Sequence, residues 1–245
     1  MSALVVQGLT KAFGGLRVTR GVDLSVAPGE RHLILGPNGA GKTTLFNQIT
    51  GDFFPDSGRV LLHGQDITTV PARRRAHMGL ARTYQIITLF GRDTILRNVT
   101  LGALGLSRQR WNPFASLDGQ TNLEARAMAA LARVGLDHVA QRPLAETSYG
   151  ERRRVEIAMA LVQEPKVMLL DEPFAGLSVD ERKDIQKLLL SMPREITMVM
   201  IEHDMDVALD FADRITLLNF GEVVVQGTRA EVVADRRTRE VYLGS

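Results

Sequence analysis

A short glycine-rich stretch holds the residues of this chain best suited to binding a phosphate group. It consists of Gly36, Pro37, Asn38, Gly39, Ala40, Gly41, Lys42, Thr43 and Thr44, and it follows the apolar run 33–35. Two glycines separated by four residues, then Lys and Thr, are typical of a phosphate-binding loop between a strand and a helix. We expect Lys42 to neutralise the β and γ phosphates and the Thr43 hydroxyl to hold Mg2+. The alternative is an ordinary glycine turn.

Two adjacent acids, Asp171 and Glu172, follow a second apolar run, Val167 to Leu170. The carboxyl ends of parallel strands open onto one crevice, which would bring these acids beside the phosphate loop. Neighbours on an extended chain face opposite ways, so one carboxylate can serve a metal while the other meets a water molecule. We predict that Asp171 belongs to the magnesium shell and that Glu172 orients or deprotonates the attacking water. The alternative is that these acids only form the polar end of a strand.

Two further polar residues are weaker candidates. His203 ends the apolar run Ile196 to Ile201, which would direct it into the same crevice as a donor to the γ-phosphate. Gln85 follows the stretch Met78 to Thr83, and by itself it is an ordinary loop glutamine. A histidine at a strand end is often structural, so both assignments need support from other residues.

A helix start is predicted at Ser148, because Ser followed by Glu three residues later, here Glu151, forms a capping box. Gly150 would let a ligand approach the helix N-terminus closely, and we expect this terminus to face a second phosphate site. The basic residues 152–154 follow at once. Three consecutive residues point to different sides of a helix, so we interpret them as solvated surface rather than a nucleic-acid patch.

Composition excludes several other classes of protein. The chain has 245 residues, enough for one sizeable core. Its 30 Lys and Arg nearly balance its 28 Asp and Glu, so net charge does not indicate nucleic acid as a partner. There is no cysteine, which excludes disulfides, thiol nucleophiles and thiolate metal sites. No apolar run approaches the roughly 20 residues of a membrane span, and residues 1–9 do not resemble a secretory signal, so we expect a soluble cytoplasmic protein.

The pattern of apolar runs predicts an α/β fold with a mostly parallel, buried sheet. Shorter strands near the N-terminus indicate a small antiparallel sheet beside it. Residues 86–162 are rich in helix-forming residues, so we expect a helical subdomain there, inserted into a core of residues 1–85 and 163–245. Within this insertion, residues 102–119 contain Gly, Ser, Asn and Pro and are predicted to form a loop.

The chain resembles the ATP-binding cassette (ABC) ATPases over its full length. The resemblance rests, in order along the chain, on the loop 36–44, Gln85, the segments 148–151 and 167–173, and His203. The resemblance implies a RecA-like phosphate-loop core with an antiparallel β-subdomain and a helical subdomain. It also implies that ATP and Mg2+ are bound. The roles that it implies are ATP binding by the loop and Lys42, Mg2+ binding by Thr43, Gln85 and Asp171, catalysis by Glu172, and a γ-phosphate contact by His203.

The same family provides an aromatic side chain that stacks on adenine, and Phe13 lies where that residue is expected. The alternative is that Phe13 is an apolar plug of the small sheet. Two positions depart from the family pattern. Tyr149 replaces the first glycine of the signature segment, which reduces backbone freedom there, and Ser178 stands where the family commonly has aspartate.

The resemblance also implies partners. In this family each ATP lies between the phosphate loop of one subunit and the signature helix of another, here Ser148, Gly150 and Glu151. A second ATPase subunit, identical or different, is therefore expected, together with two membrane permeases and, indirectly, a periplasmic substrate-binding protein. This places the chain peripherally on the cytoplasmic face of the inner membrane. Residues 86–106 are predicted to dock against the permease.

Four segments, 82–85, 174–177, 202–205 and 241–244, resemble the ATPases of branched-chain, hydrophobic amino-acid importers. Segment 150–157 and the same ending are also similar to the lipopolysaccharide-export ATPase, so export of an envelope lipid is an alternative. A soluble ATPase that acts on nucleic acid is a third possibility, but such proteins carry two cassettes or a long coiled-coil insertion. We therefore expect an importer ATPase without a nucleic-acid partner.

Overall fold

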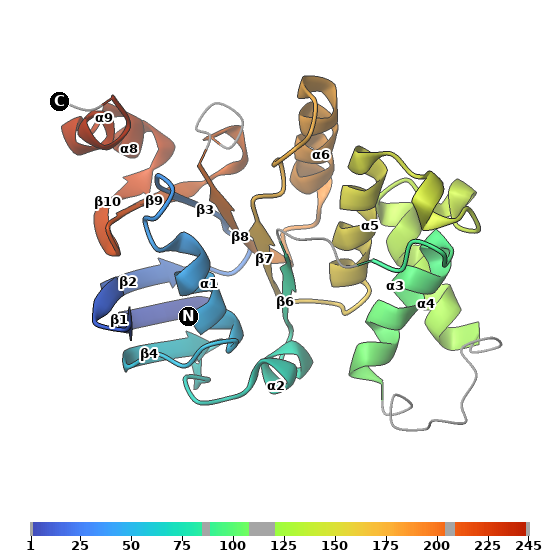
Figure 1. Cartoon of the computed structure of the whole chain (residues 1–245), viewed down its shortest axis with the longest axis horizontal. Coiled ribbons are helices and arrows are strands. Elements are labelled where there is room, and N and C mark those ends of the chain that lie inside the picture. The colour runs from blue at the N-terminus through green and yellow to red at the C-terminus, as the bar shows by residue number, and fades with distance from the viewer. Residues whose placement is uncertain (1, 85–88, 108–120, 204–208, 244–245) are drawn as a thin grey trace.

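The computed structural model describes residues 2–84, 89–107, 121–203 and 209–243, which form two sheets flanked by helices (Figure 1). The strands are β1 (Leu4–Phe13), β2 (Leu16–Val26), β3 (Arg31–Leu35), β4 (Ser57–Leu62), β5 (Gln65–Asp66), β6 (Leu80–Thr83), β7 (Val167–Asp171), β8 (Thr197–Glu202), β9 (Arg214–Asn219) and β10 (Glu222–Thr228). The α-helices are α1 (Lys42–Thr50), α2 (Ala72–His77), α3 (Ile95–Leu106), α4 (Thr121–Arg133), α5 (Tyr149–Leu161), α6 (Val179–Ser191), α8 (Arg229–Ala234) and α9 (Arg236–Leu243).

The larger sheet has six strands in the order β10-β9-β3-β8-β7-β6. All neighbouring pairs from β9 to β6 are parallel, and β10 joins β9 antiparallel at the edge. Every residue of β3, β7 and β8 is buried. Burial on both faces is what a parallel sheet requires, which is why these segments are continuous apolar runs rather than alternating ones. The predicted parallel sheet is confirmed.

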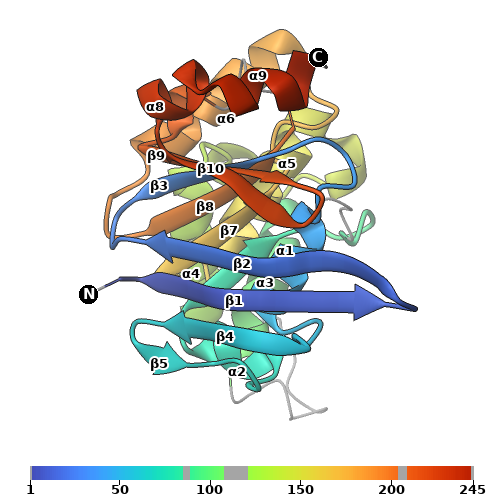
Figure 2. The ribbon, with the colours of Figure 1, turned by 90° about the vertical axis from the view of Figure 1, so that its left-hand side faces the viewer.

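The smaller sheet is antiparallel, with the order β2-β1-β4-β5. Figure 2 shows its strands lying in front of the parallel sheet. Helix α1 packs between the two sheets, because Phe46 and Ile49 share one hydrophobic cluster with residues of both. Side chains alternate between the two faces of β3, so this strand contributes to this cluster on one face and to a second cluster on the other. Ile34 faces α1, whereas Leu33 and Leu35 face the cluster that contains α3, α4, α5 and α6.

The described part of segment 89–162 forms helices that gather at one end of the molecule (Figure 1). The boundaries of the core and helical subdomains stay a prediction. The predicted loop 102–119 is wrong at its start, because α3 continues to Leu106 and buries Ala103. Packing against α4 and α5 outweighs the low helix propensity of the glycines at 102 and 105. Residues 108–120 lie outside the described residues.

The interpretation of residues 152–154 as solvated surface is also wrong for the middle one. Arg153 is completely buried, and its guanidinium donates to Glu156 Oε2 at 2.8 Å, one turn along α5. Its neighbours Arg152 and Arg154 are partly exposed. One of the three positions had to face inward, because consecutive helical residues lie about 100° apart and α5 packs on both α3 and α6.

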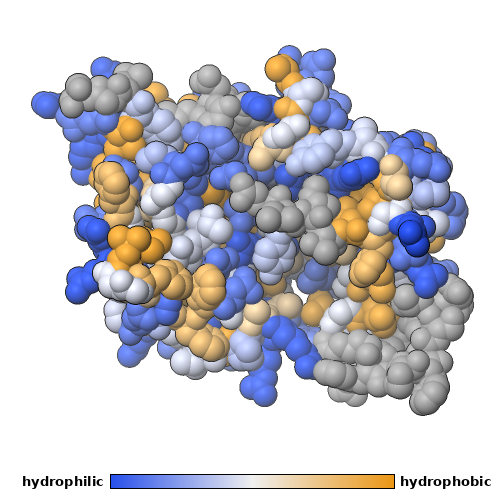
Figure 3. Space-filling model, viewed as in Figure 1, coloured by the Kyte–Doolittle hydropathy of each residue, from blue (hydrophilic) through white to orange (hydrophobic). Residues whose placement is uncertain are grey.

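No helix among the described residues is long and apolar enough to cross a bilayer. On the face that Figure 3 shows, hydrophilic residues surround smaller hydrophobic patches.

A buried arginine closes the C-terminal end of α1. Arg75, fully buried on α2, donates to the carbonyls of Gln48 and Ile49 at 2.7 Å each and to those of Thr68 and Val70. The last carbonyls of a helix have no partner within it, so this guanidinium supplies the missing donors. It thereby fixes the far end of the helix whose first residue is Lys42.

We expect Arg75→Met to lower the free energy of unfolding by about 3 kcal/mol, because two buried and two partly buried carbonyls lose their donor. Urea unfolding followed by circular dichroism measures the change. The control is Arg74→Met, since Arg74 is the exposed neighbour on the same helix. Equal stability of the two variants would show that Arg75 does not hold the end of α1.

Candidate nucleotide-binding site

The phosphate loop occupies the connection between β3 and α1, and its glycines are required by close packing. A Cβ atom at Gly36 would lie 2.3 Å from the Leu218 carbonyl oxygen, and one at Gly41 would lie 2.5 Å from that of Val18. Gly41 also has a φ of 97°, in the left-handed region. The loop is thus held against strands β2 and β9, and any side chain at these two positions would displace it.

The loop lines a hollow of about 270 Å³ together with Val18 and Glu172. Asn38, Gly39 and Thr43 are exposed there, at the N-terminus of α1. Peptide N–H groups at the start of a helix have no acceptor within it and carry a partial positive charge. The hollow therefore suits an anion such as a phosphate.

Lys42 is the buried cation of this hollow, with 5% of its surface exposed. Its ammonium donates to the carbonyl oxygens of Gly36, at 2.6 Å, and Pro37, at 3.2 Å. Burial lowers the pKa of Lys42, while the nearby carboxylates of Glu172 and Glu202 act in the opposite direction. The ammonium already lies inside the loop, where an incoming phosphate would be surrounded by N–H donors.

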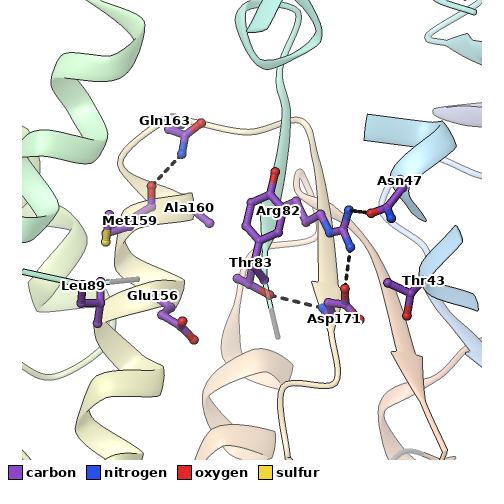
Figure 4. Close-up of a pocket in the computed structure, with 11 residues that line it drawn as sticks. Thr43, Asn47, Arg82, Thr83, Leu89, Glu156, Met159, Ala160, Gln163 and Asp171 are labelled. Atoms are coloured by element: carbon purple, nitrogen blue, oxygen red, sulfur yellow. Dashed lines mark hydrogen bonds and ion pairs between the residues drawn. The ribbon is translucent and has the colours of Figure 1, made fainter. Parts of the chain in front are cut away.

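Asp171 ends β7 and is 1% exposed. Its Oδ2 accepts a hydrogen bond of 2.6 Å from Arg82, and its backbone N–H donates to the Thr83 hydroxyl. Its Oδ1 is buried and has no hydrogen-bond partner. Thr43 lies beside it, and both line a pocket of about 620 Å³ (Figure 4). An unpartnered carboxylate oxygen next to a hydroxyl is the kind of oxygen ligand set that Mg2+ prefers, so these residues fit the predicted metal.

Glu172 and His203 lie together at the carboxyl ends of β7 and β8. Glu172 Oε1 is 3.6 Å from His203 Nδ1. Glu172 takes a left-handed backbone with φ 45°, and its N–H donates to the Ile201 carbonyl. The two acids therefore separate through this backbone turn rather than through simple strand alternation. Asp171 is buried beside Arg82, and Glu172 lines the phosphate-loop hollow.

The signature segment lies in a different hollow, of about 330 Å³, between α5 and α6. The predicted capping box is confirmed, since Ser148 Oγ accepts from the Glu151 N–H and Glu151 accepts from the Ser148 N–H. Glu151 also pairs with Arg142. The N–H of Gly150 donates to Glu181 Oε1 at 3.1 Å, so a carboxylate of the same chain occupies it. A Cβ at Gly150 would lie 2.7 Å from that oxygen, so a larger residue would require the Glu181 side chain to move.

The two departures from the family pattern lie next to residues of this hollow, because Tyr149 stands between Ser148 and Gly150 and Ser178 hydrogen-bonds to Glu181. Gly176 has a φ of 75°, which favours glycine, and a Cβ there would lie 3.1 Å from the ring of Tyr149, so a side chain would require the ring to shift. Ser178 caps α6 and forms a second capping box with Glu181. Glu181 thus holds both segments at once, through Ser178 and through Gly150.

Phe13, at the end of β1, is 43% exposed, so it is not a buried plug of the small sheet. Its ring meets that of Phe53 edge to face, with centroids 5.5 Å apart, and Lys11 Nζ lies 5.6 Å from its centroid. The exposed ring is available for stacking on a planar base.

Comparison with known proteins decides the family. Residues 19–175 match the model described as "ABC transporter". The high-affinity branched-chain amino acid transport ATP-binding protein LivG of Escherichia coli K12 is 35% identical, over 98% of this chain and 97% of its own. The chain belongs to the ABC transporter family.

Solved structures agree. The ADP conformation of MJ1267, described as an ATP-binding cassette of an ABC transporter, has a TM-score of 0.89 and 32% identity, with both chains covered completely. A dimeric post-hydrolysis structure of the cassette MJ0796, bound to ADP and Pi, has a TM-score of 0.77 and 27% identity, covering 92% of this chain and 98% of that one. The predicted fold class and the ATP-hydrolysing activity are confirmed.

The structure brings Lys42, Thr43, Asp171 and Glu172 together near the phosphate loop, and their roles stay a prediction. Gln85 lies outside the described residues. Two residues of the site were missed. Arg82 was noted only as part of the resembling segment 82–85. It is a cation on the strand next to β7, and this could have indicated a partner for Asp171. Glu181 was hidden because Ser178 and Glu181 are also an ordinary capping box.

We expect Phe13→Ala to weaken ATP binding about tenfold, because the loss of an aromatic stack on one base costs about 1–3 kcal/mol. Titration of the purified protein with a fluorescent ATP analogue measures the dissociation constant. The control is Phe54→Ala, which removes an equally exposed phenylalanine of the same surface. Unchanged affinity in Phe13→Ala would exclude the stacking role.

Proposed function

We propose that this ABC ATPase powers the import of a branched-chain amino acid or a related small molecule by closing with a second ATPase subunit around ATP. The name of the E. coli relative, which matches over nearly the whole of both chains, supports the cargo. The observation that carries the mechanism is the grouping of Lys42, Thr43, Asp171 and Glu172 around one edge of the parallel sheet.

In the proposed mechanism the loop 36–44 and Lys42 bind the phosphates of ATP. Thr43, Asp171 and Gln85 would hold Mg2+. When bound, Mg2+ would supply positive charge beside the β and γ phosphates. Glu172 orients a water molecule opposite the γ-phosphate and accepts its proton on a carboxylate oxygen. His203, 3.6 Å from that carboxylate, positions Glu172 and donates to the γ-phosphate.

The second subunit completes the site. Ser148, Gly150 and Glu151 would meet the γ-phosphate that is bound to the partner's loop. The dimeric MJ0796 cassette with ADP and Pi supports this arrangement for a related protein. Because Glu181 holds the Gly150 N–H, closure must exchange this carboxylate for a phosphate oxygen. Capping interactions with Ser178 lower the pKa of Glu181, so it is an anion, and its repulsion of the phosphate is a cost that closure has to overcome.

The membrane partners follow from the same proposal. Two permease subunits would dock against residues 86–106, near the 620 Å³ pocket that Tyr84 and Leu89 line. The chain would lie on the cytoplasmic face of the inner membrane and act indirectly with a periplasmic substrate-binding protein.

Two substitutions test the ATPase mechanism. We expect Lys42→Ala to lose ATP binding, because the buried cation is removed, and Glu172→Gln to retain binding but lose at least about 100-fold in hydrolysis, because no base remains for the water. Phosphate release and nucleotide titration measure the two quantities. In saturating ATP, Glu172→Gln should also elute as a dimer in gel filtration. Normal turnover by either variant, or a strictly monomeric Glu172→Gln protein, would contradict the proposal.

The cargo requires an experiment in cells. Deletion of the gene should lower the uptake of radiolabelled leucine, and the wild-type gene should restore it, whereas Glu172→Gln should not. Normal leucine uptake together with a loss of lipopolysaccharide from the outer membrane would favour the exporter alternative.

A further inference from the structure

A buried arginine beside the phosphate loop has no role in the mechanism above. Arg82 projects from β6, and its side chain is 4% exposed. One of its terminal nitrogens donates to Asp171 Oδ2 at 2.6 Å, and the other donates to Asn47 Oδ1, also at 2.6 Å, and contacts Asp52 at 3.2 Å. Figure 4 shows the side chain extending between Asn47 on α1 and Asp171 on β7. The guanidinium therefore ties the phosphate-loop helix to the strand that carries the predicted metal ligand.

Two aromatic rings fix the guanidinium further. The Arg82 Cζ atom lies 4.7 Å from the ring centroid of Tyr84 and 5.6 Å from that of Phe46. Phe46 belongs to the core, whereas Tyr84 is half exposed and lines the 620 Å³ pocket. A cation over an aromatic ring gains about 0.5–2 kcal/mol, more when desolvated. The direction of the guanidinium fork is thus set by packing as well as by hydrogen bonds.

The consequence for Asp171 is that its two oxygens are no longer equivalent. Arg82 occupies Oδ2, so Oδ1 remains buried without a partner. A carboxylate without this partner could rotate about its Cβ–Cγ bond and offer either oxygen in several directions. Residues that hydrogen-bond a metal ligand from behind fix its orientation, and their removal commonly costs 10–100-fold in metal affinity.

We propose that Arg82 is a positioning residue for the magnesium site: it holds Asp171 Oδ2 so that Oδ1 faces the Thr43 hydroxyl and the metal. Tyr84 lines the pocket and its ring lies against the Arg82 guanidinium. A group that displaces this ring would therefore also loosen Arg82. The proposal rests on the proposed Mg2+-dependent ATPase function.

The test is metal affinity rather than turnover. The full-length protein is loaded with the non-hydrolysable analogue adenylyl imidodiphosphate and titrated with Mn2+, and the free Mn2+ is counted by electron paramagnetic resonance. We expect Arg82→Gln to weaken Mn2+ binding about tenfold. Arg82→Lys should fall between Arg82→Gln and wild type, because it keeps the charge but loses the fork. Tyr84→Ala should weaken binding by a smaller factor, and Tyr84→Phe should match wild type.

Asp52→Asn is the matched control. It removes another carboxylate partner of the same guanidinium but leaves the bond to Asp171, so its Mn2+ affinity should stay within about twofold of wild type. Binding of the analogue in EDTA is measured for every variant and should not change. A merely structural role would lower this metal-free binding as well.

The outcomes are distinct. Unchanged or tighter Mn2+ binding in Arg82→Gln overturns the proposal, as does an equal loss in Asp52→Asn. A loss of metal-free nucleotide binding in Arg82→Gln also overturns it, because the residue would then support the loop as a whole. If the wild-type protein binds no nucleotide, the ATPase function fails instead, before Arg82 is tested.

Discussion

The buried charge of Asp171 is the constraint on which the arrangement of the site depends. A carboxylate with 1% exposure must find compensation inside the protein, and here it comes from a guanidinium that reaches across from β6. That guanidinium needs acceptors for its other nitrogen, which α1 provides through Asn47. One side chain, Arg82 of β6, thereby links the phosphate-loop helix α1 to the end of β7.

A second carboxylate, Glu181, has the corresponding place in the signature hollow. It closes the capping box of α6 and also accepts from the Gly150 N–H, so α5 and α6 are joined at their N-termini. This contact explains how the chain accommodates Tyr149 and Ser178. The tyrosine ring covers Gly176, and the serine caps α6, so the two departures support one local arrangement. In a monomer, the Gly150 N–H thus has an acceptor before any phosphate reaches it.

Local patterns carried most of the sequence-based prediction. The phosphate loop, the buried strands and the capping box at Ser148 each depend on residues a few positions apart, so they could be found by inspection. Arg82 and Asp171 are 89 positions apart, and Gly150 and Glu181 are 31 apart, so their contacts depend on the topology of the sheet and on helix packing. The burial of Arg153 was missed because it depends on how α5 packs against α3 and α6, although its hydrogen-bond partner Glu156 is only three residues away.

The pocket between β6 and α5 lies between two ion pairs that have separate partners. Glu156 and Met159 of α5 line this pocket together with Gln163, which follows the end of α5, and Arg82 faces them across it (Figure 4). Burial raises the pKa of Glu156 to about 7, and Arg153 opposes that shift, so α5 has an ion pair of its own. Arg82 hydrogen-bonds to α1 and β7, whereas Glu156 hydrogen-bonds to Arg153 within α5, so these two ion pairs do not join β6 to α5 across the pocket.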